Sequence, residues 1–139
     1  MSRWLLWHQF ALFLAWVAVI GFAIYLKPSP IGHGTHQQLG LAPCLTVAWL
    51  DRPCPGCGLT TSWTALVHGQ IATSFQAHWL GPLTFAVFTA FAWVAMGGFV
   101  QKRLINFNTR SVNLFLLTVV GAVVVYGILR FVGLLPFAR

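Results

Sequence analysis

The chain has 139 residues, of which 58% are hydrophobic and only 6% are charged, and its mean hydropathy is +0.80. Soluble domains carry about a quarter charged residues, so this composition excludes an ordinary water-soluble fold. The net charge of +7 comes from eight Lys and Arg residues against a single acid, Asp51. One carboxylate excludes mechanisms that need two, such as paired-carboxylate hydrolysis and two-metal carboxylate catalysis.

The basic residues stand mostly singly, at the ends of apolar runs. They are Arg3, Lys27, Arg52, Lys102, Arg103, Arg110, Arg130 and Arg139. This distribution is typical of membrane-interface anchors and topology signals, and it differs from the clustered basic face of a nucleic-acid-binding protein. We therefore expect the lipid bilayer, and no nucleic acid, as a partner of one integral membrane domain spanning residues 1–139.

The first apolar run, residues 4–26, is long enough to cross a bilayer, which takes about 20 apolar residues. Trp4 and Trp7 begin it and Tyr25 lies near its end, as expected for side chains at the two membrane interfaces. No small-x-small cleavage site follows Leu26. We therefore expect a retained anchor and not a cleaved signal peptide.

Two further runs, residues 80–100 and 111–135, predict a second and a third crossing. Gln101, Lys102 and Arg103 stop the second run, and Pro136 ends the third. The chain is thus predicted to be an all-α membrane protein with three transmembrane helices.

Small residues line one side of each of the later crossings. Ala86 and Ala90 form a small-xxx-small pair in the second, and Gly121 and Gly127 thin one face of the third. Such faces let a neighbouring helix approach closely, so we expect a partner membrane protein or a homo-oligomer. Arg130, near the end of the third run, is expected to snorkel to the interface.

Residues 27–78 separate the first two crossings and contain all three cysteines and four of the five histidines. Turn-forming Pro and Gly residues open this segment, which indicates irregular backbone. Residues 59–68 then show helical spacing, and residues 71–77 could form a second short helix. The segment is too apolar to be fully exposed to water, so we expect a helical Cys/His segment partly embedded in the bilayer.

Charge in the short loops predicts the orientation. With three crossings, Arg3 lies on the same side as the short loop containing Lys102, Arg103 and Arg110. The positive-inside rule makes that side cytoplasmic. The Cys/His segment then faces the periplasm or an equivalent outer compartment.

The Cys/His segment contains the sequence Cys54-Pro55-Gly56-Cys57-Gly58, with Cys44 upstream. Thiols separated by Pro-Gly can converge on one ion, and zinc takes four Cys or His ligands. Cys44 supplies a third sulfur, so a Cys3His site is possible. The candidates for the fourth ligand are His33, His36, His68 and His78.

Three other interpretations of the cysteines remain open. The Cys54–Cys57 pair before a helix could exchange disulfides, because a helix N-terminus stabilises a thiolate. In an oxidising compartment Cys44 could instead form a structural disulfide with Cys54 or Cys57. The thiols could also be small buried residues without chemistry. For His78 itself, an interfacial position beside Trp79 is the simpler expectation.

The residues that carry a family resemblance are the motif Cys54-Pro55-Gly56-Cys57-Gly58-Leu59-Thr60, the pair His68-Gly69, the run His78-Trp79-Leu80 and the run from Tyr126 to Arg130. Over roughly residues 44–130 the chain resembles a bacterial family of small membrane proteins described as domain of unknown function 2752. The resemblance implies a multi-pass protein of the bacterial inner membrane and supplies no activity. That family usually has Arg where this chain has Thr61, and often Asn-Pro where it has His78-Trp79.

The function we expect is that of a non-enzymatic accessory or complex subunit. Its outward-facing cluster would bind zinc or another thiolate-binding metal, or be locked by a disulfide, with ligands drawn from Cys44, Cys54, Cys57, His33, His36 and His68. A membrane thiol-disulfide oxidoreductase that uses the Cys54–Cys57 pair is the enzyme alternative. A scaffold subunit without site chemistry is the third possibility.

Overall fold

The computed structural model describes residues 3–135, and this part of the chain is helical and contains no strands. The elements are α1 (Arg3–Tyr25), the 3-10 helix η1 (Thr35–Leu39), α2 (Leu45–Leu50), α3 (Leu59–Val67), α4 (Ile71–Ala77), α5 (Gly81–Val100) and α6 (Arg110–Val132). Helices α1, α5 and α6 are long and apolar enough to cross a membrane, which confirms the predicted all-α architecture. Gly133, in a left-handed conformation, ends α6. Pro136 and Arg139, used in the predictions above, lie outside the described residues.

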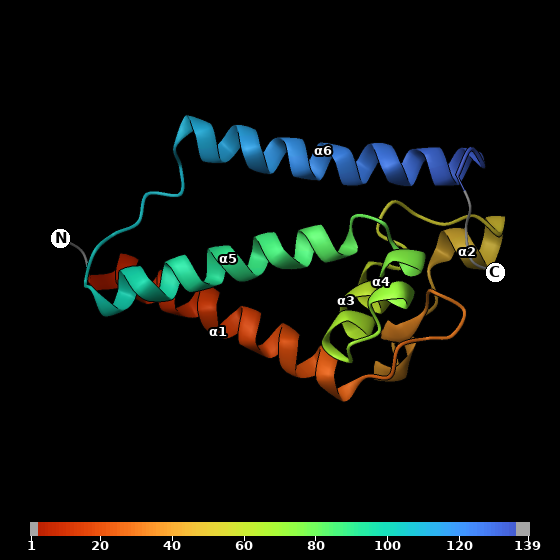
Figure 1. Cartoon of the computed structure of the whole chain (residues 1–139), viewed down its shortest axis with the longest axis horizontal. Helices are drawn as coiled ribbons and strands as arrows, with labels where there is room; N and C mark the ends of the chain where they lie inside the picture. The colour runs from red at the N-terminus through yellow and green to blue at the C-terminus, as the bar shows by residue number, and fades with distance from the viewer. Residues whose placement is uncertain (1–2, 136–139) are drawn as a thin grey trace.

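Helices α1 and α5 form an antiparallel pair held by aromatic side chains (Figure 1). Trp16 of α1 stacks on Phe88 of α5 with ring centroids 5.5 Å apart, and its indole N–H donates to the Thr89 hydroxyl at 3.2 Å. Near the other end of the pair, the rings of Phe10 and Phe99 stack at 4.9 Å. Helix α6 lies apart from this pair along most of its length (Figure 1).

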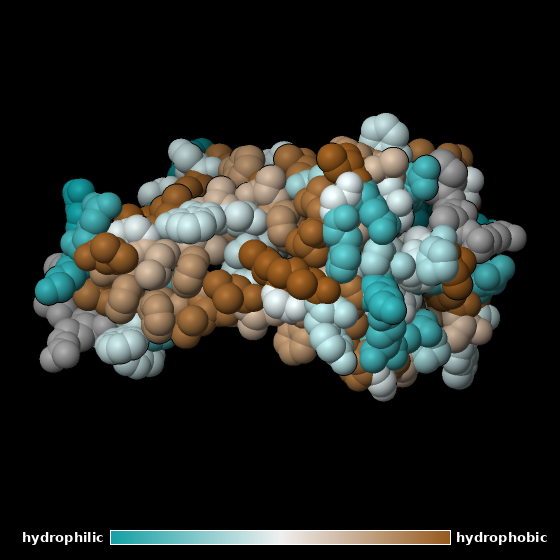
Figure 2. Space-filling view, turned by 60° about the horizontal axis from the view of Figure 1, so that its bottom comes forward, coloured by the Kyte–Doolittle hydropathy of each residue, from teal (hydrophilic) through white to brown (hydrophobic). Residues whose placement is uncertain are grey.

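The two ends of the molecule differ in chemistry. The connection between α5 and α6 lies at one end, beside the start of α1, and the short helices lie at the opposite end (Figure 1). Figure 2 shows an apolar surface along the long helices, with polar side chains gathered over the short-helix segment and at the far tip. This distribution fits a body whose middle contacts lipid and whose ends reach the headgroups.

The segment between α1 and α5 buries hydroxyl groups. Helix α3 turns Leu59, Trp63 and Leu66 to one side, as its spacing predicts, yet these side chains are only half-buried. Its fully buried side carries Thr61, Ser62, Thr64 and Ala65. The helical spacing of the apolar residues did not predict this inward-facing polar side. Polar groups are expected to turn inward when a helix is surrounded by lipid, because lipid cannot form hydrogen bonds with them.

Hydrogen bonds satisfy the buried hydroxyls. Thr61 and Thr35 hydroxyl oxygens lie 2.7 Å apart, which joins α3 to η1. Ser62 and Ser74 hydroxyl oxygens lie 2.8 Å apart, and the Ser74 hydroxyl also donates to the Ser62 carbonyl, which joins α3 to α4. One link joins helices distant in sequence and the other joins two consecutive helices, so the short helices η1, α3 and α4 form one unit.

Replacing Thr61 by Val is expected to destabilise the protein by about 1–3 kcal/mol, because the buried Thr35 hydroxyl would then face a methyl group. Thr60→Val is the matched control: it makes the same change on an exposed residue of the same helix. Unfolding of both variants in detergent, followed by circular dichroism, measures the difference. Equal stability of the two variants would contradict a stabilising role for the Thr35–Thr61 hydrogen bond.

Candidate metal centre

The three cysteines converge at one point of the short-helix segment. Cys44 caps the N-terminus of α2, and Cys54 and Cys57 lie in the turn that precedes α3. All three are free thiols, and their sulfur atoms lie within 4.8 Å of one another. Cys57 is buried at 6% exposure, and the other two are half-buried.

The turn brings its two sulfurs together through its own backbone. The N–H of Cys57 donates to the carbonyl of Cys54 at 2.9 Å, and the N–H of Leu59 donates to the carbonyl of Gly56 at 3.1 Å. Gly58 follows with φ of 88°, a left-handed conformation that favours glycine. A Cβ at this position would also overlap the carbonyl oxygens of Ala77 and Gly32. Gly58 therefore allows the turn to pack tightly against the rest of the segment.

A small cavity of about 220 Å³ opens beside the sulfurs. Its lining comprises Gly34, His36, Cys44, Cys54, Gly56, Cys57, Gly58, Thr60 and Thr61. His36 is thus the histidine of the predicted set that shares a cavity with the thiols. Its Nε2 atom lies 3.3 Å from the carbonyl oxygen of Ala42, a long contact that leaves the ring weakly held.

The other two histidines of the predicted ligand set lie elsewhere. His68 ends α3, where its side chain is exposed and its Nδ1 contacts the Thr64 carbonyl at 2.8 Å. His33 lies in the turn before η1 and is not among the residues lining the cavity. The structure therefore brings the sulfurs of Cys44, Cys54 and Cys57 together and places His36 in the lining of the same cavity, whereas His33 and His68 are not part of that lining.

The three thiols differ in acidity. Burial alone would raise the pKa of Cys44, but hydrogen bonds from Thr46, the Cys54 thiol and the backbone of α2 lower it to about 7. Burial and the adjacent Cys44 thiol raise the pKa of Cys54. Cys44 therefore loses the first proton of the cluster.

Cys57 is the least acidic of the three. Burial, followed by the charges of Cys54 and Cys44, raises the pKa of Cys57 to about 12, although the Arg130 guanidinium opposes this rise. Under the redox interpretation, the stabilised thiolate is expected in the Cys54–Cys57 pair before α3. The structure instead puts the lowered pKa on the N-cap of α2, because that thiol receives the hydrogen bonds.

Residues 44–92 match the model of a family described as "Protein of unknown function (DUF2752)". This part of the chain is therefore similar to that family. The match begins at Cys44, includes the Cys54–Cys57 turn, and ends within α5, so the resemblance noted around Tyr126 lies outside it. Neither the curated proteins nor the solved structures searched contain a match to the chain.

Arg130 and His78 contact the Cys54–Cys57 turn, and both are buried where the sequence predicted a position at the membrane interface. Arg130 was expected to snorkel to the interface, but it is only 2% exposed and its Nη1 donates to the Cys57 carbonyl at 3.0 Å. His78 was expected at the interface, but it is fully buried, with its ring 4.9 Å from that of Tyr126. Both expectations were wrong because α6 folds its C-terminal end against the turn, which hydropathy alone does not reveal.

The acidity order predicts which thiol reacts first. In metal-free protein, alkylation of Cys44 by iodoacetamide should accelerate as the pH rises through about 7, because the thiolate is the nucleophile. Cys57 should remain slow throughout neutral pH, because its pKa is about 12 and it is buried. Mass spectrometry of peptides after timed labelling measures both rates. Faster labelling of Cys57 than of Cys44 at pH 7 would contradict the order.

Proposed function

We propose that this protein is a non-enzymatic membrane component that holds one thiophilic divalent ion, with zinc as the leading candidate. Its ligands would be Cys44, Cys54, Cys57 and His36. The observation that carries the proposal is the convergence of three free thiols within 4.8 Å on a cavity that His36 also lines.

The spacing of the sulfurs is close to what zinc requires. Zinc–sulfur bonds of about 2.3 Å in a tetrahedron put the sulfurs about 3.8 Å apart. Sulfurs within 4.8 Å would need to move by no more than about 1 Å to reach this separation. The weakly held His36 ring could turn toward the cavity at little cost.

The charges are also compatible with a bound divalent ion. Thiols bind zinc as thiolates, so binding would release the protons of Cys44, Cys54 and Cys57. A divalent ion with three thiolates and one neutral histidine carries one net negative charge. The buried Arg130 guanidinium, which donates to the Cys57 carbonyl, lies beside that charge and would offset it.

The proposed site would lie near the outer face of a bacterial cytoplasmic membrane, with the N-terminus inside. Two observations support this. The basic connection between α5 and α6 lies at the opposite end of the molecule from the cysteines (Figure 1). Arg130 also contacts the cysteine turn only two residues before the end of α6, a rise of about 3 Å.

Thiol-disulfide exchange is the second candidate, and one observation favours it. Cys44 has a pKa of about 7 and a hydrogen bond with the Cys54 thiol, so an attacking thiolate lies beside a possible partner. In this case oxidation of the two thiols to a disulfide would pass two electrons to an external dithiol-disulfide carrier. The experiment below separates the two candidates.

Purified protein should bind one Zn²⁺ per chain, and Co²⁺ in its place should show thiolate-to-cobalt charge-transfer absorption. Each single change of Cys44, Cys54 or Cys57 to Ser should weaken binding by more than about 100-fold, because a ligand contributes more than the 10–100-fold of an outer-shell partner. His36→Asn should weaken binding and change the cobalt spectrum.

The matched control is His68→Asn, because that histidine is exposed and outside the cavity. Its zinc affinity should equal that of the unchanged protein. Absence of zinc binding by fully reduced protein, with Cys44 and Cys54 cycling under a dithiol reductant, would replace the metal proposal by thiol exchange.

A further inference from the structure

The C-terminal end of α6 packs directly against the turn that carries two of the proposed ligands. Gly127 lies so close to Pro55 that a Cβ would overlap the Pro55 backbone. Three residues later, one turn along the same face, Arg130 donates to the Cys57 carbonyl at 3.0 Å. Helix α6 thus contacts Pro55, one of the two residues between the cysteines, and Cys57 itself.

Two further contacts complete this junction. The Tyr126 ring lies 4.9 Å from the buried His78 ring, whose Nε2 is 3.4 Å from the Pro55 carbonyl oxygen. The Arg130 guanidinium lies over the Tyr126 ring at 5.5 Å from its centroid. The turn is therefore contacted by α6 and by His78, the residue that follows α4.

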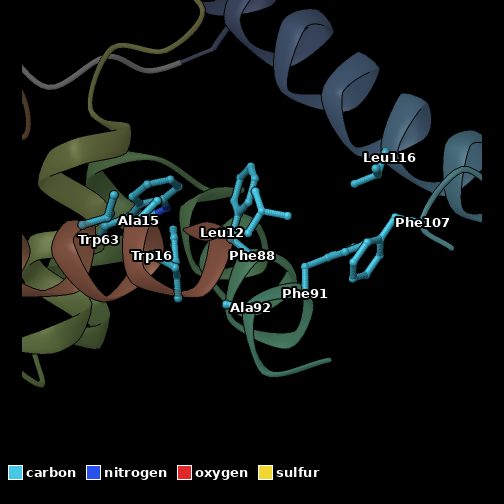
Figure 3. Close-up of a pocket in the computed structure, with 10 residues that line it drawn as sticks. Leu12, Ala15, Trp16, Trp63, Phe88, Phe91, Ala92, Phe107 and Leu116 are labelled. Atoms are coloured by element: carbon cyan, nitrogen blue, oxygen red, sulfur yellow. The ribbon is translucent and has the colours of Figure 1, made fainter. Parts of the chain in front are cut away.

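The rest of α6 is held much less firmly. Only 6% of an 18-residue apolar stretch of α6 is buried, and within the described chain this helix shares no extensive packing with α1 or α5. An apolar opening of about 480 Å³ separates it from that pair: Leu116 of α6 and Phe107 lie on one side, and Trp16 and Phe88 lie on the other (Figure 3). Helices associate in lipid through close packing and interhelical hydrogen bonds. In α6 both are concentrated at its C-terminal end.

We propose that this end of α6 positions the ligand turn, so that metal binding and the docking of α6 stabilise each other. The inference rests on the proposed metal site. Arg130 acts as a positioning residue: it holds the Cys57 carbonyl and places a positive charge beside the thiolates. Gly127 acts by allowing the close approach of the helix to Pro55.

Reciprocity follows from thermodynamic linkage. A metal that orders the turn must favour docked α6 by the same factor by which docked α6 favours the metal. Displacing α6 would move Pro55 and, through the short turn, the sulfurs of Cys54 and Cys57. Anything that pulls on α6, such as a partner helix in the bilayer, would then change the metal affinity.

Gly127→Ala tests the coupling, because the added methyl group must push α6 away from the Pro55 backbone. Gly121→Ala is the matched control: it lies on the same helix and a Cβ there meets no atom within 4 Å. Zinc affinity is measured by competition with a chromophoric chelator in the full chain in detergent. We expect a loss of about 10-fold for Gly127→Ala, the size of an outer-shell effect, and no loss for Gly121→Ala.

The position of α6 is measured in the same proteins. Spin labels attached through non-natural amino acids at the exposed positions Leu117 of α6 and Trp93 of α5 leave the cysteines untouched. The distance distribution between them should narrow on addition of Zn²⁺ in the unchanged protein and in Gly121→Ala, and should stay broad in Gly127→Ala. Circular dichroism confirms that the variants remain folded.

Arg130 supplies an independent test. Arg130→Met removes the donor and the charge, and should weaken zinc binding by about 10-fold and shift the cobalt charge-transfer bands. Arg130→Lys keeps the charge and one donor, so it should restore part of the affinity, which a purely structural role would not predict.

The outcomes separate the two proposals. Zinc binding that is equal in Gly127→Ala and Gly121→Ala, or a label distance that ignores zinc, would overturn the coupling and leave the metal site intact. Failure of the unchanged protein to bind zinc or cobalt would overturn the metal site, and the coupling with it.

Discussion

Pairing of buried hydroxyls is the interaction on which the cysteine segment depends. In lipid-like surroundings, apolar side chains gain little by turning inward, whereas an unpaired hydroxyl or backbone group is costly anywhere. Thr35–Thr61 and Ser62–Ser74 therefore supply the links that join η1, α3 and α4. These links fix the start of α3, and with it the turn that carries Cys54 and Cys57. The position of the thiols is thus a consequence of polar packing.

The second constraint is the closeness of backbones around that turn. Gly58 lets the turn pass the carbonyl groups of Ala77 and Gly32, and Gly127 lets α6 reach Pro55. Between these two close approaches the turn has little room to move. A ligand site gains from such rigidity, because less conformational entropy is lost when an ion binds. The turn is held from both sides before any ligand arrives.

Much of the architecture could be predicted from the sequence, because long apolar runs and their charged ends report directly on lipid contact. The helices over residues 4–26, 80–100 and 111–135 needed only composition, and the structure has α1, α5 and α6 close to those limits. The convergence of Cys54 with Cys57 followed from local turn chemistry. The approach of Cys44 depended on a nine-residue connection to Cys54 whose path no local pattern specifies, so it could only be offered as a possibility.

The burial of Arg130 and His78 could not be predicted, because it depends on how far α6 reaches along the molecule. Hydropathy gives the length of a transmembrane helix, but it does not show how far that helix is shifted along its axis relative to its neighbours. The sequence left the choice among the histidines open for a related reason: His33, His36 and His68 all lie within about a dozen residues of a cysteine, and only the fold places His36 on the cavity beside the thiols. One signal was available. Arg130 lies near the end of an apolar run, in a chain whose only carboxylate is Asp51. Such an arginine is worth testing as the partner of the cysteine thiolates.

Charge balance links that arginine to the number of cysteines. Deep in a protein near lipid, a net charge is costly unless an opposite charge lies beside it. Four thiolates around a divalent ion would leave two negative charges, and two thiolates with two histidines would leave none. Three thiolates with one histidine leave one, which the single guanidinium of Arg130 can offset beside Cys57. With Arg130 counted, the proposed set of three thiolates, one histidine and a divalent ion would therefore carry no net charge, as a buried site beside lipid requires.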